Sequence, residues 1–196
     1  MQQNPFNAGY YTEDELQKMG YKSIGKNVRI AKNNTIVGLE KISIGDNVRI
    51  DGYCAIIASG DGFVDIGSYI HIGGWSYLSA GHGISLEDFV NISQGVRIYT
   101  RTDDYSGESL TNPMIPEKYS DVSSGSVVLK KHVIVGSGSI ILPNLIIAEG
   151  ASIGALSLVK ENLSAWGIYC GVPAIKIKNR SKNLLKLEQQ FLAEND

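Results

Sequence analysis

The 196-residue sequence has few cysteines, only three histidines and no long hydrophobic run. Cys54 and Cys170 are too few for a disulfide scaffold, and no cysteine–histidine spacing matches a zinc site, so we expect reduced thiols and no metal. No apolar stretch approaches the roughly 20 residues that span a bilayer, and residues 1–15 lack the charged and then apolar layout of a signal peptide. We therefore expect no membrane span and a cytoplasmic protein.

An excess of charge of either sign is also missing. The chain carries 18 basic and 20 acidic residues, for a formal net charge of -2. Proteins that bind nucleic acid concentrate lysine and arginine, because neutralising phosphates releases counterions. The sequence contains no such cluster, so we expect no nucleic-acid partner.

The sequence does contain a six-residue repeat. The 22 glycines and the spacing of six, rather than three and four, disfavour a helical bundle. Taken three at a time, the repeats predict an all-β fold, a parallel β-helix of about six coils over residues 24–164. The repeating aliphatic positions are Ile24, Ile30, Ile36, Ile44, Ile50, Ile56, Ile66, Ile72, Leu78, Leu86, Ile92, Ile98, Leu129, Val135, Ile141, Ile147, Ile153 and Val159.

Extra residues interrupt the repeat at one corner of this predicted solenoid. They are residues 42–43, 62–65, 84–85 and 104–128, and each follows the third unit of a coil. A solenoid has no structural need for the longest of them, and long loops in compact domains are often functional. We expect residues 104–128 to protrude as a functional loop.

Both ends of the chain predict short helices within a single domain over 1–196. In the N-terminal cap, residues 1–23, Thr12 and Glu15 form a capping box that covers the first coil. The C-terminal segment, residues 165–196, carries Leu184, Leu187 and Phe191 at near-helical spacing. We expect this second helix to pack on the last coil or on a neighbouring subunit.

The repeats, the protruding loop and the closing segment WGIYCGVPAIKIK, residues 166–178, together resemble the hexapeptide-repeat acyltransferases, and within them the sugar acetyltransferases. The likeness covers about residues 20–180. It implies a left-handed β-helix, an exception to the usual right-handed crossover, in a homotrimer with active sites between subunits. It also implies transfer of an acetyl group from acetyl-CoA to a hydroxyl or amine of a sugar, as in lipopolysaccharide O-antigen biosynthesis.

The resemblance further implies a CoA site in the last coils. Related galactoside enzymes often have threonine in place of Lys160 and arginine in place of Ile175, which leaves the phosphate contacts open. Lys160, Lys176 and Lys178 either act as point charges for the CoA phosphates or form a solvated face. The expected cofactor-binding residues are Gly136, Ser137, Gly154, Ala155, Lys160, Pro173, Ile175 and Lys178.

The histidine that normally precedes the long loop in this family is absent, and Asp103 occupies its place. Because coils stack about 4.8 Å apart, we expect His82 beside Thr102 and within reach of Asp103 or Asp104. His82 and Asp103 are therefore the candidate catalytic pair, with Asp104 as the alternative aspartate. The alternative is that His82 only fills a turn. A hydroxyl acceptor favours His82 as the base, whereas for an amine acceptor an aspartate suffices.

Four further residues are expected to contact the sugar: Trp75, Arg101, Asp104 and Tyr105. Carboxylates accept hydrogen bonds from hydroxyls or pair with an amine, although the residues around Asp104 also match ordinary turn chemistry. We expect His71 to pack, with acceptor contact as the alternative.

The remaining histidine, His132, is expected to lie exposed on a corner. A zinc site of the carbonic-anhydrase kind is disfavoured because the three histidines occupy different repeat positions. A serine or antibiotic acceptor and a non-catalytic scaffold remain open alternatives.

Overall fold

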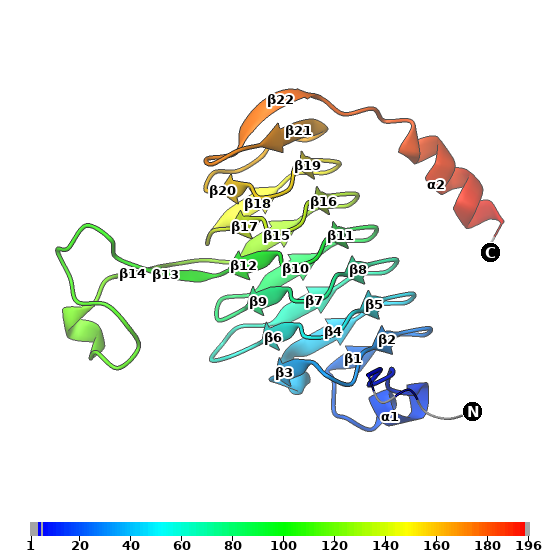
Figure 1. The fold of residues 1–196 in the computed structure, drawn as a ribbon, viewed down its shortest axis with the longest axis horizontal. Coiled ribbons are helices and arrows are strands. Elements are labelled where there is room, and N and C mark those ends of the chain that lie inside the picture. The colour runs from blue at the N-terminus through cyan, green and yellow to red at the C-terminus, as the bar shows by residue number, and fades with distance from the viewer. Residues whose placement is uncertain (1–3, 5, 195–196) are drawn as a thin grey trace.

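The computed structural model describes residue 4 and residues 6–194. Three sheets of parallel strands form the sides of a triangular solenoid, and each coil contributes one strand to each sheet (Figure 1). Only the last strand of the second sheet is antiparallel to its neighbour among the described residues. The first sheet contains β1 (Ser23–Ile24), β4 (Ile42–Ile44), β7 (Val64–Ile66), β10 (Ile84–Leu86), β15 (Val127–Leu129) and β18 (Leu145–Ile147).

The other two sheets follow the same order. The second sheet contains β2 (Arg29–Ile30), β5 (Arg49–Ile50), β8 (His71–Ile72), β11 (Asn91–Ile92), β16 (Ile134–Val135), β19 (Ser152–Ile153), β21 (Gly167–Cys170) and β22 (Ile175–Asn179). The third sheet contains β3 (Thr35–Val37), β6 (Ala55–Ile57), β9 (Tyr77–Ser79), β12 (Arg97–Tyr99), β17 (Ile140–Ile141) and β20 (Leu158–Val159). The result is six full coils, with β21 beginning a seventh, and the predicted all-β parallel β-helix is confirmed.

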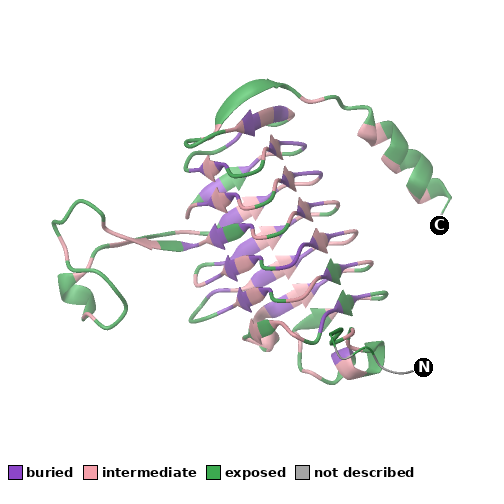
Figure 2. Ribbon diagram, viewed as in Figure 1, coloured by how far each residue is buried: buried purple, intermediate pink, exposed green. Residues whose placement is uncertain are grey.

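The six-residue repeat fills the interior of the solenoid. Ile50, Ile72 and Ile92 pair in register along the second sheet, and each has an exposed fraction of 0%. Figure 2 shows the buried residues concentrated in the strands. Burying one such side chain contributes about 1.5–3 kcal/mol to folding, so stacking the coils is what stabilises strands of two or three residues.

The three corners have different roles. The first corner joins the first sheet to the second, the second corner joins the second sheet to the third, and the third corner leads back to the first sheet. At the first two corners, residues with left-handed backbone recur from coil to coil. Their N–H groups donate to carbonyls of the coil before, as Phe89 does to Ser68 and Trp75 to Gly52.

The third corner carries the insertions. In the first coil it forms a 3-10 helix, η1 (Leu39–Lys41). In the fourth coil the chain leaves the solenoid as an antiparallel hairpin, β13 (Arg101–Asp103) and β14 (Val122–Ser124), with η2 (Glu117–Tyr119) in the excursion (Figure 1). The predicted loop 104–128 therefore has an ordered stalk that begins at Arg101, and β15 has already begun by Val127.

The N-terminal helix forms as expected. Helix α1 (Glu13–Gln17) has the full capping box, in which Glu15 N–H donates to the Thr12 hydroxyl and Thr12 N–H donates to the Glu15 carboxylate. Leu16 is buried and joins the core of the solenoid. This contact explains why a helix of five residues is stable at this position, since packing rather than propensity stabilises short helices.

The C-terminal helix does not pack on the last coil, which is one of the two places expected for it. Helix α2 (Leu184–Ala193) lies along the first corner, where the Phe191 ring meets the edges or faces of Tyr69 and Phe89 at centroid distances of 5.3 and 6.4 Å. These rings belong to the third and fourth coils, so the expectation of packing on the last coil is wrong. Neither helix in the described part of the chain is long and apolar enough to cross a membrane.

Candidate active site

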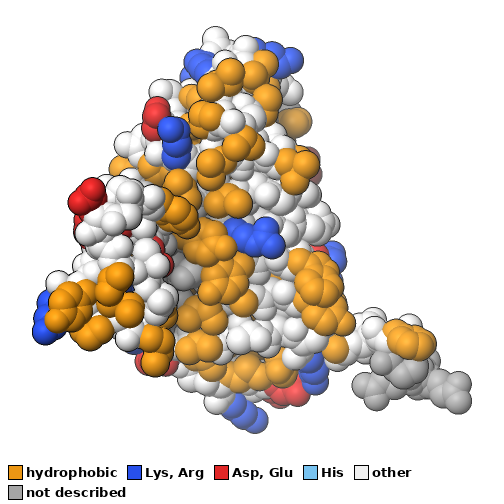
Figure 3. Space-filling model, turned by 60° about the vertical axis from the view of Figure 1, so that its left-hand side comes forward, with side chains coloured by type: hydrophobic (Ala, Val, Ile, Leu, Met, Phe, Trp, Pro, Cys, Tyr) orange, Lys and Arg blue, Asp and Glu red, His pale blue; other side chains and the backbone are white. Residues whose placement is uncertain are grey.

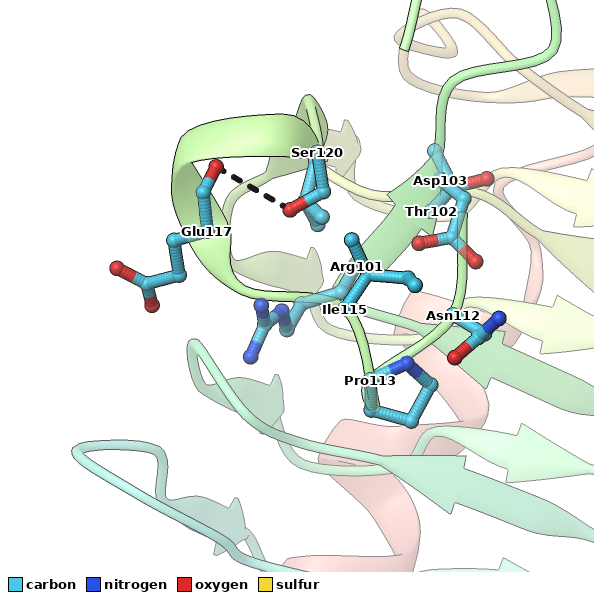
Figure 4. A pocket seen from close by; sticks show the side chains of 9 residues that line it. Arg101, Thr102, Asp103, Asn112, Pro113, Ile115, Glu117 and Ser120 are labelled. Atoms are coloured by element: carbon cyan, nitrogen blue, oxygen red, sulfur yellow. Dashed lines mark hydrogen bonds between the residues drawn. The ribbon is translucent and has the colours of Figure 1, made fainter. Parts of the chain in front are cut away.

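The excursion from the third corner contains a groove of about 400 Å³ between the hairpin strands and the segment that follows β13, lined by residues within 101–122. Arg101 and Asp103 project from β13, while Asn112 and Glu117 come from the excursion beyond it (Figure 4). Asp103 is half-buried. A cation, a carboxylate and an amide around one hollow can bind a polar acceptor and fix its orientation.

His82 lines a second groove of about 500 Å³, whose wall also includes Arg101 and Glu117. The His82 N–H donates to Thr100 Oγ1 over 3.1 Å, so its neighbour on the next coil is Thr100 rather than the expected Thr102. Among the residues that the structure describes, the His82 ring has no hydrogen-bond partner, and the expected pair with Asp103 is not formed.

Asp104 has a structural role in the hairpin. Its carboxylate accepts hydrogen bonds from the N–H groups of Ser106 and Ser109, at 2.8 and 3.2 Å, and from the Ser109 hydroxyl. The hydrogen bonds from Ser106 are the main reason that its pKa falls to about 2. Turn chemistry thus explains Asp104, while the neighbouring Tyr105 is almost fully exposed.

Trp75 lies at the second corner, away from His82. Its ring stacks on Tyr53 with centroids 4.4 Å apart and planes 12° apart. The two rings line a groove of about 400 Å³ together with Asp51 and Gln94. The structure therefore separates Trp75 from Arg101, Asp104 and Tyr105, which are all at the third corner.

Most of the expected cofactor residues share the second corner with Trp75. Gly136 and Ser137 follow β16, and Gly154 and Ala155 follow β19, so these pairs stack. The Gly171–Pro173 turn attaches next to them, since the Leu158 N–H donates to Gly171 O and the Ala174 N–H donates to Leu158 O. The remaining three residues, Lys160, Ile175 and Lys178, are exposed near the C-terminal end of the solenoid.

The histidine–aspartate pair that the structure does contain is one that we did not predict. His71 Nε2 lies 2.9 Å from Asp51 Oδ2, and Arg49 Nε donates to the other oxygen over 2.7 Å. Burial would raise the pKa of Asp51, but hydrogen bonds from His71 and Arg49 outweigh it and hold the pKa below its usual value. Asp51 and His71 are 20 residues apart, one coil, and this spacing is the signal that was missed.

His132 is buried rather than exposed, so the prediction for this residue is wrong. Its side chain is 7% exposed, and Nε2 lies 2.8 Å from Glu188 Oε2 on α2. Lys131 pairs with the other Glu188 oxygen at 2.5 Å. Arg180 adds hydrogen bonds to the carbonyls of His132 and Gly150, which fix the segment before α2 on the first corner.

Within residue 4 and residues 6–194, no group of three or more histidine, cysteine, aspartate or glutamate side chains is placed to hold a metal ion. No protein-family model matches the chain.

Comparison with known proteins finds close relatives. The chain is 46% identical over 182 residues to a dTDP-4-amino-4,6-dideoxy-D-glucose acyltransferase of Escherichia coli, covering 93% of this chain and 94% of that protein. AntD, an N-acyltransferase from Bacillus cereus, has been solved as a variant in complex with dTDP-4-amino-4,6-dideoxyglucose and coenzyme A. It matches with a TM-score of 0.92 and 47% identity over 96% of this chain and 99% of that one.

Two further solved structures extend the comparison. AntD in complex with dTDP and 3-hydroxybutyryl-CoA matches with a TM-score of 0.91 and 46% identity, over 97% of this chain and 100% of that one. A hexapeptide-repeat acetyltransferase from Vibrio cholerae, in complex with acetyl-CoA, is 15% identical with a TM-score of 0.58, over 85% of this chain and 75% of that one. The second likeness shows the fold alone, and the shared fold is consistent with the expected left-handed β-helix.

Proposed function

Because the chain belongs to the family of hexapeptide-repeat acyltransferases that act on dTDP-linked amino sugars, we propose that it transfers an acyl group from acyl-CoA to the amine of dTDP-4-amino-4,6-dideoxyglucose. The observation that carries this proposal is the 46% identity to an acyltransferase for that substrate over 93% of the chain. The acyl donor is acetyl-CoA or a longer acyl-CoA, since a relative binds 3-hydroxybutyryl-CoA.

An amine acceptor accounts for the missing histidine. The neutral amine attacks the thioester carbonyl, the C–N bond forms, the C–S bond breaks, and the amine proton passes to a base or to the departing thiolate. A neutral amine is a better nucleophile than a hydroxyl, so its proton can leave late and a weaker base suffices. We assign Asp103 as the group that accepts this proton or orients the amine, and His82 as a residue of the adjoining groove.

The two halves of this site come from different corners, which supports a homotrimer. In one chain, Asp103 lies at the third corner and the expected cofactor residues Gly136 and Gly154 lie at the second. A cleft that contains both sets requires the third corner of one subunit to face the second corner of its neighbour. Hydrophobic side chains also form a band along the solenoid beside the hairpin, a surface that a neighbour would cover (Figure 3).

The cellular setting follows from the substrate class. Nucleotide-linked sugars are precursors of surface polysaccharides, so the reaction belongs to the cytoplasmic stage of envelope polysaccharide synthesis, such as that of the lipopolysaccharide O-antigen. The chain would then supply an N-acylated sugar to the enzymes that assemble the polymer.

A thiol-release assay tests the proposed function. Acetyl-CoA and 3-hydroxybutyryl-CoA are each incubated with the protein and with dTDP-4-amino-4,6-dideoxyglucose, free sugars, serine or an amino-alcohol antibiotic. We expect thiol release with the dTDP-linked amino sugar alone. Release with serine or an antibiotic would contradict the acceptor, and silence together with an absence of CoA binding by calorimetry would favour the scaffold alternative.

Two substitutions separate the candidate bases. We expect Asp103→Asn to lower kcat about 100-fold, because a positioned base contributes at least that much. His82→Ala should lower kcat less than about tenfold, and Asp65→Asn, which changes an outward carboxylate of the first sheet, is the matched control. A larger loss for His82→Ala than for Asp103→Asn would reverse the assignment.

A further inference from the structure

Arg180 connects the C-terminal segment to three successive coils of the solenoid. Its Nη1 donates to His132 O over 2.7 Å and to Gly150 O over 3.1 Å, and its backbone N–H donates to Trp166 O over 2.7 Å. The pairing of β16 with β19, and of β19 with β21, places these three acceptors at equivalent positions in coils five, six and seven. One arginine therefore bridges the last three coils at the first corner.

The three acceptors belong to a column of stacked residues with left-handed backbone, and each of the first two corners has such a column. The first-corner column is Asn27, Asn47, Tyr69, Phe89, His132, Gly150 and Trp166, and the second-corner column is Tyr53, Trp75, Gly95, Gly138 and Leu156.

Arg180 binds carbonyls that the ladder between the coils does not use. At the first corner, the N–H of a column residue donates to the carbonyl that precedes the column in the coil before, as Gly150 does to Lys131 O. The carbonyls of His132 and Gly150 themselves are thus free to accept from Arg180. The guanidinium is half-buried, and burial lowers its pKa. Hydrogen bonds from a charged donor are stronger than neutral ones, so this contact is a firm anchor.

The strand before Arg180, β22, has no buried side chain. All five residues of Ile175–Asn179 are exposed, and within the described residues β22 pairs only with β21 (Figure 1). The turn that leads into β22 is fixed by Leu158, which bonds to Gly171 and Ala174. The other end of the strand leads directly into Arg180. Because burial does not stabilise β22, hydrogen bonds at its two ends hold it on the solenoid.

We propose that Arg180 is a positioning residue for acyl-CoA, which it does not touch, and that it acts by holding β22 in place. This inference rests on the proposed function, in which acyl-CoA is the donor. Lys176 and Lys178 lie on β22 and, with the exposed Lys160, give this end of the solenoid a positive charge that suits the phosphates of CoA. When β22 detaches at Arg180, two of these three charges lose their fixed position.

The expected effect follows from the fraction of molecules in which β22 is attached. The apparent dissociation constant of CoA equals the intrinsic constant divided by that fraction. Arg180→Ala removes both side-chain hydrogen bonds, and we expect it to leave about a tenth of the molecules attached, which raises the Kd of CoA and the KM of acyl-CoA about tenfold. Arg180→Lys keeps the charge and one hydrogen bond, so it should restore most of the affinity.

The test combines calorimetric titration of CoA into the full-length protein with thiol-release kinetics on acetyl-CoA and dTDP-4-amino-4,6-dideoxyglucose. In Arg180→Ala, kcat and the KM of the sugar should stay within about twofold of the wild type. Hydrogen exchange should be faster in β22 and unchanged in β11. Arg29→Ala is the matched control, because Arg29 is an exposed arginine of the same sheet at the opposite end of the solenoid.

A second variant separates Arg180 from the helix that follows it. Glu188→Gln weakens the attachment of α2 to Lys131 and His132 but keeps the hydrogen bonds of Arg180. We expect this variant to leave the KM of acyl-CoA unchanged. A rise as large as that in Arg180→Ala would show that α2, rather than Arg180, holds β22, and would overturn the proposal.

The outcomes distinguish the role of Arg180 from the proposed function. Wild-type protein that binds no CoA would overturn both. Wild-type binding of CoA that Arg180→Ala does not weaken would overturn the positioning role alone. A fall in kcat together with a rise in both KM values, without rescue by Arg180→Lys, would also overturn it, because that result indicates a general loss of structure.

Discussion

The first and second corners of the solenoid use the same turn geometry but differ in what covers their aromatic side chains. At the first corner, the rings of Phe89 and His132 stack with centroids 5.1 Å apart, and α2 packs over the column through Phe191. At the second corner, Tyr53 and Trp75 stack as closely but remain largely exposed.

The first corner therefore contributes to the stability of the fold, whereas the second corner is available for binding. Aromatic area that α2 covers is removed from water and stabilises the fold, whereas exposed aromatic area at the second corner is available to a ligand. The glycines show the same contrast. A Cβ on Gly150 would lie 2.5 Å from the Trp166 ring, while a Cβ on Gly95 would contact only Gly138 backbone atoms, at 3.9 Å. Side chains cover the glycine of the first corner, Gly150, but not Gly95 at the second corner.

The pair of glycines gives the largest expected effect. Gly150→Ala should lower the free energy of unfolding by about 2 kcal/mol, because the new methyl group overlaps the Trp166 ring. Gly95→Ala should cost about 1 kcal/mol, the penalty for alanine with left-handed backbone, because its φ is nearly equal and no side chain overlaps the new methyl group. Chemical denaturation of both variants measures the difference. Equal losses would mean that backbone strain, rather than the filling of the columns, decides the tolerance of each position.

The anchor of α2 should give a smaller effect that depends on pH. Burial would raise the pKa of Glu188, but hydrogen bonds from Lys131 and His132 outweigh it and lower the pKa. A lowered folded-state pKa stabilises the protein above the unfolded value of about 4.3, and this contribution is lost as pH falls through the folded value. Glu188→Gln should therefore cost about 1 kcal/mol at pH 7 and less at pH 3.

Hydrogen exchange locates this effect. Amides of α2 should exchange faster in Glu188→Gln than in the wild type at pH 7, while amides of β11 stay protected. Glu194→Gln, at the end of the same helix, is the control. Unchanged exchange in α2 would show that the aromatic contacts of Phe191 hold the helix without the ion pairs.

Tyr53 should give the smallest effect. Its ring stacks on one face of the exposed Trp75 ring, so Tyr53→Ala should lower the free energy of unfolding by about 1 kcal/mol. Tyr53→Phe keeps the stacking and should unfold as the wild type does in the same chemical denaturation. A loss larger than that of Gly150→Ala would show that the exposed aromatic pair, rather than the covered first corner, stabilises the solenoid.

The fold was predictable because its signal is local and repeated. Inward positions such as Ile50 and Ile72 recur at fixed spacing, so the coils, the parallel sheets and the corner of the insertions follow from the sequence alone. The capping box of α1 is equally local. The position of α2 was not predictable, because it depends on contacts between Glu188 and His132, which lie 56 residues apart.

The candidate site was predictable only in part. The sequence identifies a protruding loop and the absence of a histidine at Asp103, but not the hairpin stalk, and it leaves Asp104 open between sugar contact and turn chemistry. Stacking places His71 beside Asp51, and it leaves no side chain above Trp75, where Gly95 follows in the second-corner column. Both features depend on which residues share a register. Counting from coil to coil would have found the first, whereas the second requires knowing that Leu156 already covers Gly138.

The most direct test of N-acyl transfer compares an amine with a hydroxyl at the same position of the acceptor. Acyl-CoA is incubated with dTDP-4-amino-4,6-dideoxyglucose or with dTDP-6-deoxyglucose, which carries a hydroxyl at that carbon, and the products are identified by mass spectrometry and NMR. We expect an amide at the amino-bearing carbon and no product from the hydroxyl sugar. An ester formed from dTDP-6-deoxyglucose at a comparable rate would contradict it.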